Sequence, residues 1–254
     1  MSWLCRGWQV FDSEPAVAAW VEAARVPALA AAAREPRRHG GTWCVGVDIL
    51  DNDAEGRVTG GPPLRGAAFA EAALQTGVRQ LHRAQVSVTH PGYPGRDPEE
   101  SAANHRFRRD RDAAHLDGLL PVGPEKRRQL REPHAWILGI ALNAASAQAA
   151  PLVVWDGSHE IIRRAFAQGF DGIAPHDWAT RDVTETYRAA RADVFERCER
   201  IEVPLRPGQS VLLHRMTIHG VAPWKAGADA PPEGRATAYF RPLVARPEDW
   251  LALS

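Results

Sequence analysis

The chain has 254 residues, of which 44% are hydrophobic and 24% charged, a balance typical of a globular protein rather than of a disordered or membrane-embedded one. Lysine plus arginine equals aspartate plus glutamate at 31 each, so the formal net charge is zero. The basic excess that draws proteins to phosphate backbones or anionic lipid is therefore missing. We expect a small-molecule substrate as the partner, with neither nucleic acid nor a membrane, and the oligomeric state stays open.

The N-terminus and the cysteines bear on the cellular compartment. No basic stretch leads into an apolar one at the N-terminus, and no run approaches the roughly 18 apolar residues of a membrane span. The three cysteines, Cys5, Cys44 and Cys198, are scattered and odd in number, which argues against a disulfide framework. We therefore predict a cytoplasmic protein with neither a signal peptide nor a transmembrane helix.

The first 90 residues predict helices and strands in turn. The Ser13 hydroxyl is expected to cap a helix with Pro15 in its first turn. This alanine-rich helix continues to about Arg34, with an interruption near Pro27. Three further elements follow: a strand over 42–50, a helix over 65–76 closed by Gly77, and a strand over 80–90.

Residues 91–112 predict a long loop, because they combine several prolines and glycines with a charged run. Long loops inside compact domains are usually functional or disordered, and this one is well placed to be a lid. Its polar side chains are expected either to meet an anionic substrate or to form a solvated charged face. The side chains in question are Asn104, Arg106, Arg108, Arg109 and Arg111.

The remainder of the chain is dominated by strand patterns. Strands are predicted over 113–120, 134–143, 151–155, 200–205, 209–215 and 235–244, with helices from Ser158 to about Ala167 and from Asp177 to about Arg197. Strands and helices do not alternate regularly, which disfavours a doubly wound parallel sheet. We predict a mainly β protein, an antiparallel sandwich or jelly roll with flanking helices, in a single domain over 1–254. An N-terminal elaboration occupies about 1–90 and the jelly-roll core about 78–245.

The strongest candidates for chemistry are metal ligands. His115 and Asp117 are two residues apart in a predicted strand, so both side chains point to the same face and can reach one metal ion. Alone, this pair is expected by chance about once in a chain with ten histidines. His219 lies just past the end of the strand in PGQSVLLHRMTIHG, beside Gly220, and is favoured over His214 in mid-strand. Two histidines and one carboxylate suit non-haem Fe(II) oxygenases.

The order of the motifs resembles the phytanoyl-CoA dioxygenase family of Fe(II)/2-oxoglutarate-dependent oxygenases. The matching pieces are HLD (115–117), IALN (140–143), PLVVWDGSH (151–159), PGQSVLLHRMTIHG (207–220) and GRATAYFRP (234–242). The resemblance implies a double-stranded β-helix, the cupin-like jelly roll, with Fe(II), 2-oxoglutarate and O2 as cofactor and co-substrates. It implies that His115, Asp117 and His219 are the iron ligands and that Arg235 binds the distal carboxylate of 2-oxoglutarate. The reaction would hydroxylate an unactivated C–H bond of a small molecule and release succinate and CO2.

Several alternatives stay open. The Ala/Pro/Gly-rich segment 226–234 looks inserted between His219 and Arg235, and Arg241, on the same face of the strand, is the rival partner for 2-oxoglutarate. Val221 stands where the family often has a small hydroxyl residue. A non-catalytic jelly-roll protein that binds a metal or a small molecule would share these motifs, and so would a cupin-like metalloenzyme that does not use 2-oxoglutarate. The sequence does not select a substrate.

Overall fold

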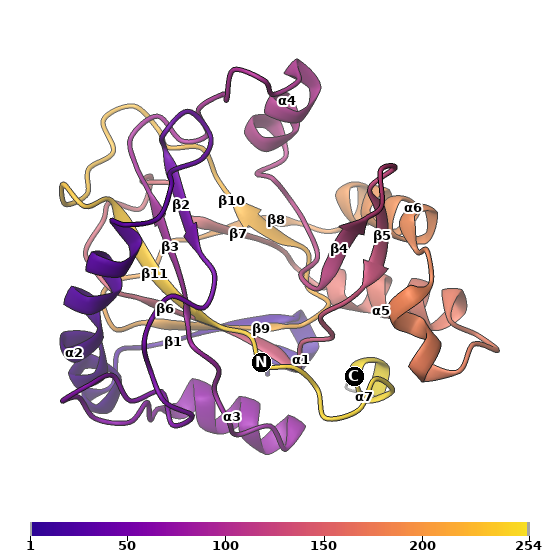
Figure 1. Cartoon of the computed structure of the whole chain (residues 1–254), viewed down its shortest axis with the longest axis horizontal. Coiled ribbons are helices and arrows are strands. Elements are labelled where there is room, and N and C mark those ends of the chain that lie inside the picture. The colour runs from indigo at the N-terminus through magenta and orange to yellow at the C-terminus, as the bar shows by residue number, and fades with distance from the viewer. Residues whose placement is uncertain (1, 253–254) are drawn as a thin grey trace.

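The computed structural model describes residues 2–252 (Figure 1). Its elements in chain order are α1 (Trp3–Arg6), β1 (Trp8–Phe11), α2 (Pro15–Ala32), β2 (Trp43–Gly46), α3 (Ala67–Thr76), β3 (Gln85–Thr89), α4 (Ala102–Asp110), β4 (Leu119–Val122), β5 (Arg127–Leu130), β6 (Trp136–Ala141), β7 (Leu152–Trp155), α5 (Ser158–Gly169), the 3-10 helix η1 (Pro175–Thr180), α6 (Thr184–Arg197), β8 (Arg200–Val203), β9 (Ser210–His214), β10 (His219–Val221), β11 (Arg235–Phe240) and α7 (Asp249–Ala252).

Two antiparallel sheets form the centre of the molecule. The larger sheet has the strand order β1-β9-β6-β11-β3-β2, and the smaller has the order β10-β7-β8. From β6 onward the chain passes repeatedly between them: β6 is in the large sheet, β7 and β8 in the small one, β9 in the large, β10 in the small and β11 in the large. This connectivity is that of a double-stranded jelly roll, which confirms the predicted fold class.

Side-chain alternation buries both faces of the strands. Ile137 of β6 and Leu213 of β9 point inward and form one core with Leu152 and Val154 of the small sheet. Their neighbours in sequence point outward, as Leu138 does, and pack in a second core with α2 and α3. Each side chain of this size contributes about 1.5–3 kcal/mol when fully buried. The near-continuous apolar runs in β6 and β9 therefore follow from burial on both faces.

The same alternation gives β11 one apolar and one polar face. Ala236, Ala238 and Phe240 belong to the outer core beneath the helices. Arg235 and Tyr239, on the opposite face by the period of two, therefore point between the two sheets. The inner space of the jelly roll is apolar along β6 and β9 and polar along β11.

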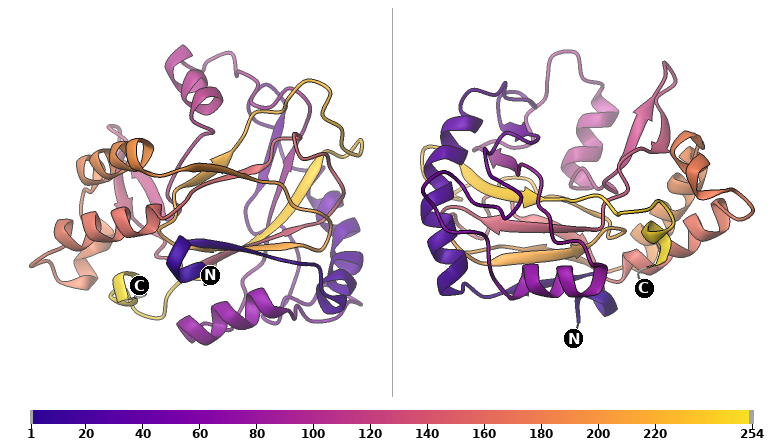
Figure 2. Two further views of the ribbon diagram at one scale, coloured as in Figure 1. Left: turned by 180° about the vertical axis from the view of Figure 1, so that it is seen from behind. Right: turned by 60° about the horizontal axis from the view of Figure 1, so that its bottom comes forward.

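Helices cover the outer face of the large sheet and lie beside the small sheet (Figure 2). Helices α2 and α3 lie against the large sheet, and α5 and α6 pack against each other beside the small sheet. Helix α2 continues through Pro27, contrary to the predicted interruption. Pro27 is exposed, so water can satisfy the carbonyl that loses its partner, while Ala24 and Ala28 hold the helix on the sheet.

Two predicted helix starts were wrong. Glu14, not Ser13, is the N-cap residue of α2, and its carboxylate accepts a hydrogen bond from the backbone N–H of Ala67 at the start of α3. The helix expected from Asp177 begins at Thr184, because Asp182 accepts hydrogen bonds from the backbone N–H and the hydroxyl of that threonine. The predicted closure of α3 at Gly77 is confirmed, with φ of 73° at this glycine.

The region predicted as an irregular loop over 91–112 contains helix α4. The Ser101 side chain accepts a hydrogen bond from the backbone N–H of Asn104 and so caps the helix. No residue of α4 is buried, so the helix lacks the apolar periodicity by which a sequence reveals one. The strand predicted over 113–120 is also shorter: His115 makes an isolated bridge, and β4 begins at Leu119.

Among residues 2–252, Arg215 has no carboxylate partner; it is buried and holds the C-terminal helix through backbone carbonyls. Its guanidinium donates from Nε to Trp250 O at 2.6 Å, from Nη1 to Ala135 O at 3.2 Å and from Nη2 to Asp249 O at 2.7 Å. We expect Arg215→Met to lower the free energy of unfolding by about 3 kcal/mol, because three carbonyls lose a charged donor. Urea unfolding measures this loss. The exposed Arg246→Met should stay within about 0.5 kcal/mol of wild type, and equal losses in both variants would contradict the assignment.

Two further observations concern the predicted compartment. Among the residues that the structure describes, no helix is both long and apolar enough to cross a membrane. The three cysteines are free thiols, as their spacing predicted. The cytoplasmic location stays a prediction.

Candidate metal centre

The short segment that carries His115 and Asp117 is fixed at both ends. Just before it, the Asp112 carboxylate receives two hydrogen bonds from Arg200 of β8, at 2.6 and 2.7 Å. Just after it, the carbonyl of Gly118 accepts a hydrogen bond from the backbone N–H of Arg131 at 3.0 Å. A bidentate arginine–carboxylate pair has a defined geometry as well as a favourable energy. The segment is therefore held against the edge of the small sheet.

His115 and His219 form an isolated antiparallel β-bridge. The N–H of His115 donates to the carbonyl of His219 at 2.9 Å, and the reverse hydrogen bond measures 3.1 Å. Gly220 permits this approach, because a Cβ at this position would lie 2.1 Å from the carbonyl oxygen of Asp112. The His-Gly pair in the sequence thus has a steric reason: the glycine lets the His115 segment close against β10.

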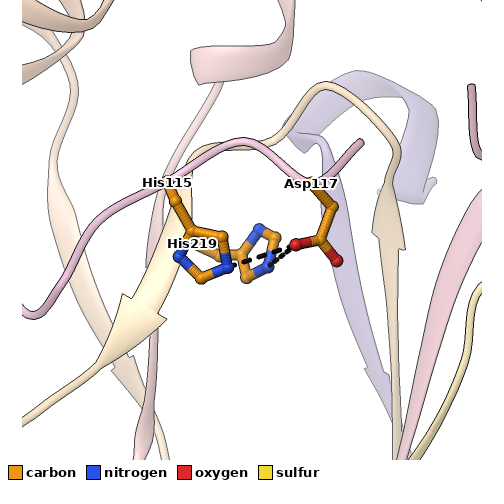
Figure 3. A group of neighbouring side chains, drawn as sticks. All are labelled: His115, Asp117 and His219. Atoms are coloured by element: carbon orange, nitrogen blue, oxygen red, sulfur yellow. Dashed lines mark ion pairs between the residues drawn. The ribbon is translucent and has the colours of Figure 1, made fainter. Parts of the chain in front are cut away.

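The side chains of His115, Asp117 and His219 converge (Figure 3). Asp117 Oδ1 lies 3.2 Å from His115 Nε2 and 3.9 Å from His219 Nε2, and one ligand atom from each residue lies within 4.8 Å of the others. Ligand atoms about 2.1 Å from one transition-metal ion lie about 3 Å apart when they are at right angles. The donor set and its spacing therefore fit a metal ion.

Backbone carbonyls fix the tautomers of both imidazoles. His115 Nδ1 lies 3.0 Å from the carbonyl of Ala113, and His219 Nδ1 lies 2.9 Å from the carbonyl of Thr217. A carbonyl oxygen only accepts, so each Nδ1 carries a proton, and Nε2 is the nitrogen of each ring that is left for a metal ion. Metal-binding histidines generally have such a partner on the second nitrogen.

The pKa values of the group are set by burial and by mutual charge. Burial opposes the Asp117 carboxylate, but the hydrogen bond from His115 and the positive charges around it hold the pKa of Asp117 well below its usual value. Burial and the charge of His115 lower the pKa of His219 to about 4. Partial burial opposes the charged form of His115, but the Asp117 carboxylate raises its pKa. At neutral pH Asp117 is ionised and His219 is neutral, the states that metal binding requires, and a metal ion bound here would displace the proton from His115 Nε2.

The two candidate arginines occupy different places. Arg241 lies 3.2 Å from Oδ2 of Asp117, the oxygen that does not face the histidines. Arg235, at the start of β11, is 8% exposed, and its Nη2 is buried without a hydrogen-bond partner. Thr89, directly opposite Arg235 on β3, likewise has a buried hydroxyl group without a partner. Each unpaired buried polar group costs about 1–3 kcal/mol, so this cluster calls for a bound polar group.

Tyr239 links the two places along the inner face of β11. Burial raises the pKa of its phenol, the positive charge of Arg235 opposes that shift, and the negative charge of Asp117 adds to it. The phenol therefore lies within electrostatic reach of both groups. A polar strip runs along β11 from the Asp117 end of the strand toward Arg235.

Two other histidines are placed away from this group. His159 is fully buried and hydrogen-bonded to the carbonyl of Leu4, and its ring packs against that of His214 at 5.0 Å. Within residues 2–252, His115, Asp117 and His219 are the only set of three or more such side chains with metal-binding spacing. Arg200 anchors the His115–Asp117 segment through Asp112, and nothing in the sequence indicates that these two residues pair.

At the level of sequence, no protein-family model and no curated protein matches the chain. Solved structures with similar folds include the epimerase SnoN from nogalamycin biosynthesis in complex with Fe3+, alpha ketoglutarate and nogalamycin RO (18% identity, 96% of this chain and 81% of that chain, TM-score 0.49). The alpha ketoglutarate-dependent carbocyclase SnoK from nogalamycin biosynthesis (16%, 94% and 81%, 0.47) and EctD from S. alaskensis with bound Fe (15%, 94% and 73%, 0.42) are further examples.

These similarities carry no activity or residue role to this chain, because the identities and TM-scores are low. The phytanoyl-CoA dioxygenase family in particular stays a prediction. The chain's own geometry provides two things: a jelly roll, and within it a His-Asp-His group suited to a metal ion.

Proposed function

We propose that the protein is an Fe(II)- and 2-oxoglutarate-dependent oxygenase in which His115, Asp117 and His219 hold the iron. The observation that carries the proposal is the convergence of the Nε2 atoms of two histidines on one ionised carboxylate, with Nδ1 of both imidazoles held by a backbone carbonyl. Three ligands of this kind on one face leave room for further ligands, which is the arrangement of non-haem Fe(II) oxygenases.

Arg241 supports this arrangement by its contact with Asp117. It occupies Oδ2, so Oδ1 alone is directed toward the two histidines. A carboxylate held in this way would offer a metal ion one oxygen, Oδ1. Arg241 is thus a positioning residue in the proposal rather than the partner of 2-oxoglutarate.

Arg235 is the proposed partner of the distal carboxylate of 2-oxoglutarate. Its unpaired Nη2 and the unpaired hydroxyl of Thr89 form a buried polar cluster on the inner face of the large sheet. A guanidinium can bind a carboxylate through two parallel hydrogen bonds, and a hydroxyl can donate a third. A dicarboxylate extended along β11 from the metal ligands would end at this cluster.

The chain's own residues bind and orient the reactants in this proposal. When bound, iron and 2-oxoglutarate supply, with O2, the oxidation of a substrate R–H to R–OH, together with succinate and CO2. Two histidines and Asp117 orient the metal, Arg235 orients the co-substrate, and apolar side chains such as Ile137 and Leu213 keep water from the inner space.

Anaerobic titration tests the proposal. We expect a weak visible charge-transfer band when both Fe(II) and 2-oxoglutarate are present with the protein, and none with either alone. The Asp117→Ala variant is the matched control and should give no band. Binding of iron without any response to 2-oxoglutarate would instead indicate a cupin-like metalloenzyme of another kind. Absence of iron binding would overturn the proposal in favour of a non-catalytic jelly-roll protein.

A further inference from the structure

A polar pocket of about 330 Å³ opens next to His115. It lies between α4, α6 and the segment that leads from His115 into β4, and Figure 1 shows α4 and α6 on either side of the β4–β5 hairpin. The outer part of the His115 side chain is 49% exposed, so the ring borders both this pocket and the Asp117–His219 group. A molecule in the pocket would therefore lie against a proposed iron ligand.

Positively charged side chains outnumber negatively charged ones in the lining of this pocket. Arg108 of α4 forms an ion pair with Glu100, so these two charges neutralise each other. Arg128 of β5 and Arg191 of α6 also line the pocket, and no carboxylate in the described part of the chain forms an ion pair with either. Two positive charges therefore face the pocket without a negative partner.

Aromatic rings hold Arg191 in place. Its guanidinium lies 4.8 Å from the ring centre of Phe107 and 5.0 Å from that of Tyr187. Tyr187 is itself fixed, because its hydroxyl accepts a hydrogen bond from the backbone N–H of Leu116 at 3.1 Å. Contact with the rings leaves N–H groups at the edge of the guanidinium, where it hydrogen-bonds to Tyr187 and where its contact with Ala114 O measures 3.5 Å.

Arg128 contributes a second donor from the hairpin. Its Nη1 donates to the carbonyl of Leu119 at 3.0 Å, which orients the side chain and leaves its other N–H groups available. Its backbone N–H donates to the Thr184 hydroxyl at the start of α6, so the hairpin and this helix are joined at the pocket. The two guanidinium groups thus come from elements fixed to each other.

We propose that this pocket binds a carboxylate or phosphate group of the substrate, with Arg191 and Arg128 as its partners. The inference rests on the proposed function for the identity of the reaction, and it deepens that proposal by naming the substrate class as a small anionic molecule. An oxyanion suits prepositioned arginines, because the guanidinium fork pairs with two of its oxygens. The anion would lie next to His115, so the reacting carbon belongs to the part of the molecule that extends past this ring.

The site is separate from the one proposed for 2-oxoglutarate. Arg235 does not line the pocket, and it points instead into the space between the sheets. The candidates offered by the sequence for an anionic substrate were Asn104, Arg106, Arg108, Arg109 and Arg111. Of these, Asn104 and Arg108 line the pocket, and the charge of Arg108 is already neutralised by Glu100. The positive charge without a partner comes from Arg191 of α6 and Arg128 of β5, which the sequence did not indicate as candidates.

Calorimetric titration of the metal-free chain with inorganic phosphate and, separately, with acetate tests the proposal. We expect at least one of the two to bind, and Arg191→Met to weaken that binding about 10- to 100-fold, the equivalent of about 1.5–3 kcal/mol for a charged hydrogen-bonded contact. Arg128→Met should weaken it in the same direction. The tighter of the two probes indicates whether the natural group is a phosphate or a carboxylate.

Arg188→Met is the matched control, because Arg188 is on the same helix, 65% exposed and paired with Glu185. It should leave probe binding unchanged. Acetate can also reach Arg235, so the acetate titrations are repeated in an Arg235→Ala background. The proposal is overturned if neither probe binds, or if Arg191→Met with a wild-type circular dichroism spectrum binds both probes as tightly as Arg188→Met. Because iron and 2-oxoglutarate are absent, either result is independent of the oxygenase proposal.

Discussion

The Asp117→Ala variant is expected to lose Fe(II)-dependent consumption of 2-oxoglutarate and to keep its fold. Asp117 supplies the only carboxylate of the three converging side chains, and Oδ1 lies within 4 Å of both histidine Nε2 atoms. Even partners in the outer shell of a metal site change affinity by about 10- to 100-fold, so loss of a direct ligand should lower Fe(II) affinity by at least about 100-fold. Equilibrium Fe(II) binding and succinate formation measure the two effects.

The free energy of unfolding of Asp117→Ala distinguishes a metal-ligand role of Asp117 from a structural role. Asp117 is 12% exposed and contacts Arg241, so its removal also leaves that guanidinium without its carboxylate. Asp110→Ala is the control, since Asp110 is an exposed acid that pairs with Arg109. Asp110→Ala should retain Fe(II) binding and turnover. Full 2-oxoglutarate consumption by Asp117→Ala would show that the metal, if one is bound, is held elsewhere.

The second large effect is expected from Arg235→Ala, as a rise in the KM for 2-oxoglutarate of about 30- to 100-fold. The reason is the loss of a buried charged hydrogen-bonded contact, about 2–3 kcal/mol, at a position where Nη2 now lacks any protein partner. Fe(II) affinity measured without 2-oxoglutarate should stay close to wild type. Succinate formation over a range of 2-oxoglutarate concentrations gives the KM.

Arg241→Ala is the variant to compare with Arg235→Ala, because Arg241 is the other candidate arginine but contacts Asp117. It should lower Fe(II) affinity, with a smaller change in the KM for 2-oxoglutarate measured at saturating iron. The opposite pattern, with a raised KM in Arg241→Ala and a normal one in Arg235→Ala, would exchange the roles of the two arginines. Arg235→Lys should recover part of the lost affinity, since it restores the charge but not the two-pronged geometry.

Much of the fold could be predicted because the signals are local. A few neighbouring residues are enough to predict β6 and β9 from their apolar runs, and the end of α3 from its glycine. The side chains of His115 and Asp117 were predicted to point to the same place, and both do lie in the group with His219. The strand predicted around them is reduced to a single β-bridge at His115. Helix α4 could not be predicted, because a helix with no buried residue has no apolar stripe to read.

By itself, the sequence determined the alternation that builds two facing sheets and the residues able to serve as metal ligands. Only the tertiary structure decided which charged groups meet. Arg241 reaches Asp117 across 124 residues of chain, and Arg200 reaches Asp112 across 88. Arg191 borders the His115 pocket from a helix whose sequence carries no sign of it. Such contacts depend on how the jelly roll closes, because a side chain's hydrogen-bond and charge partners are set by spatial distance and not by spacing along the chain.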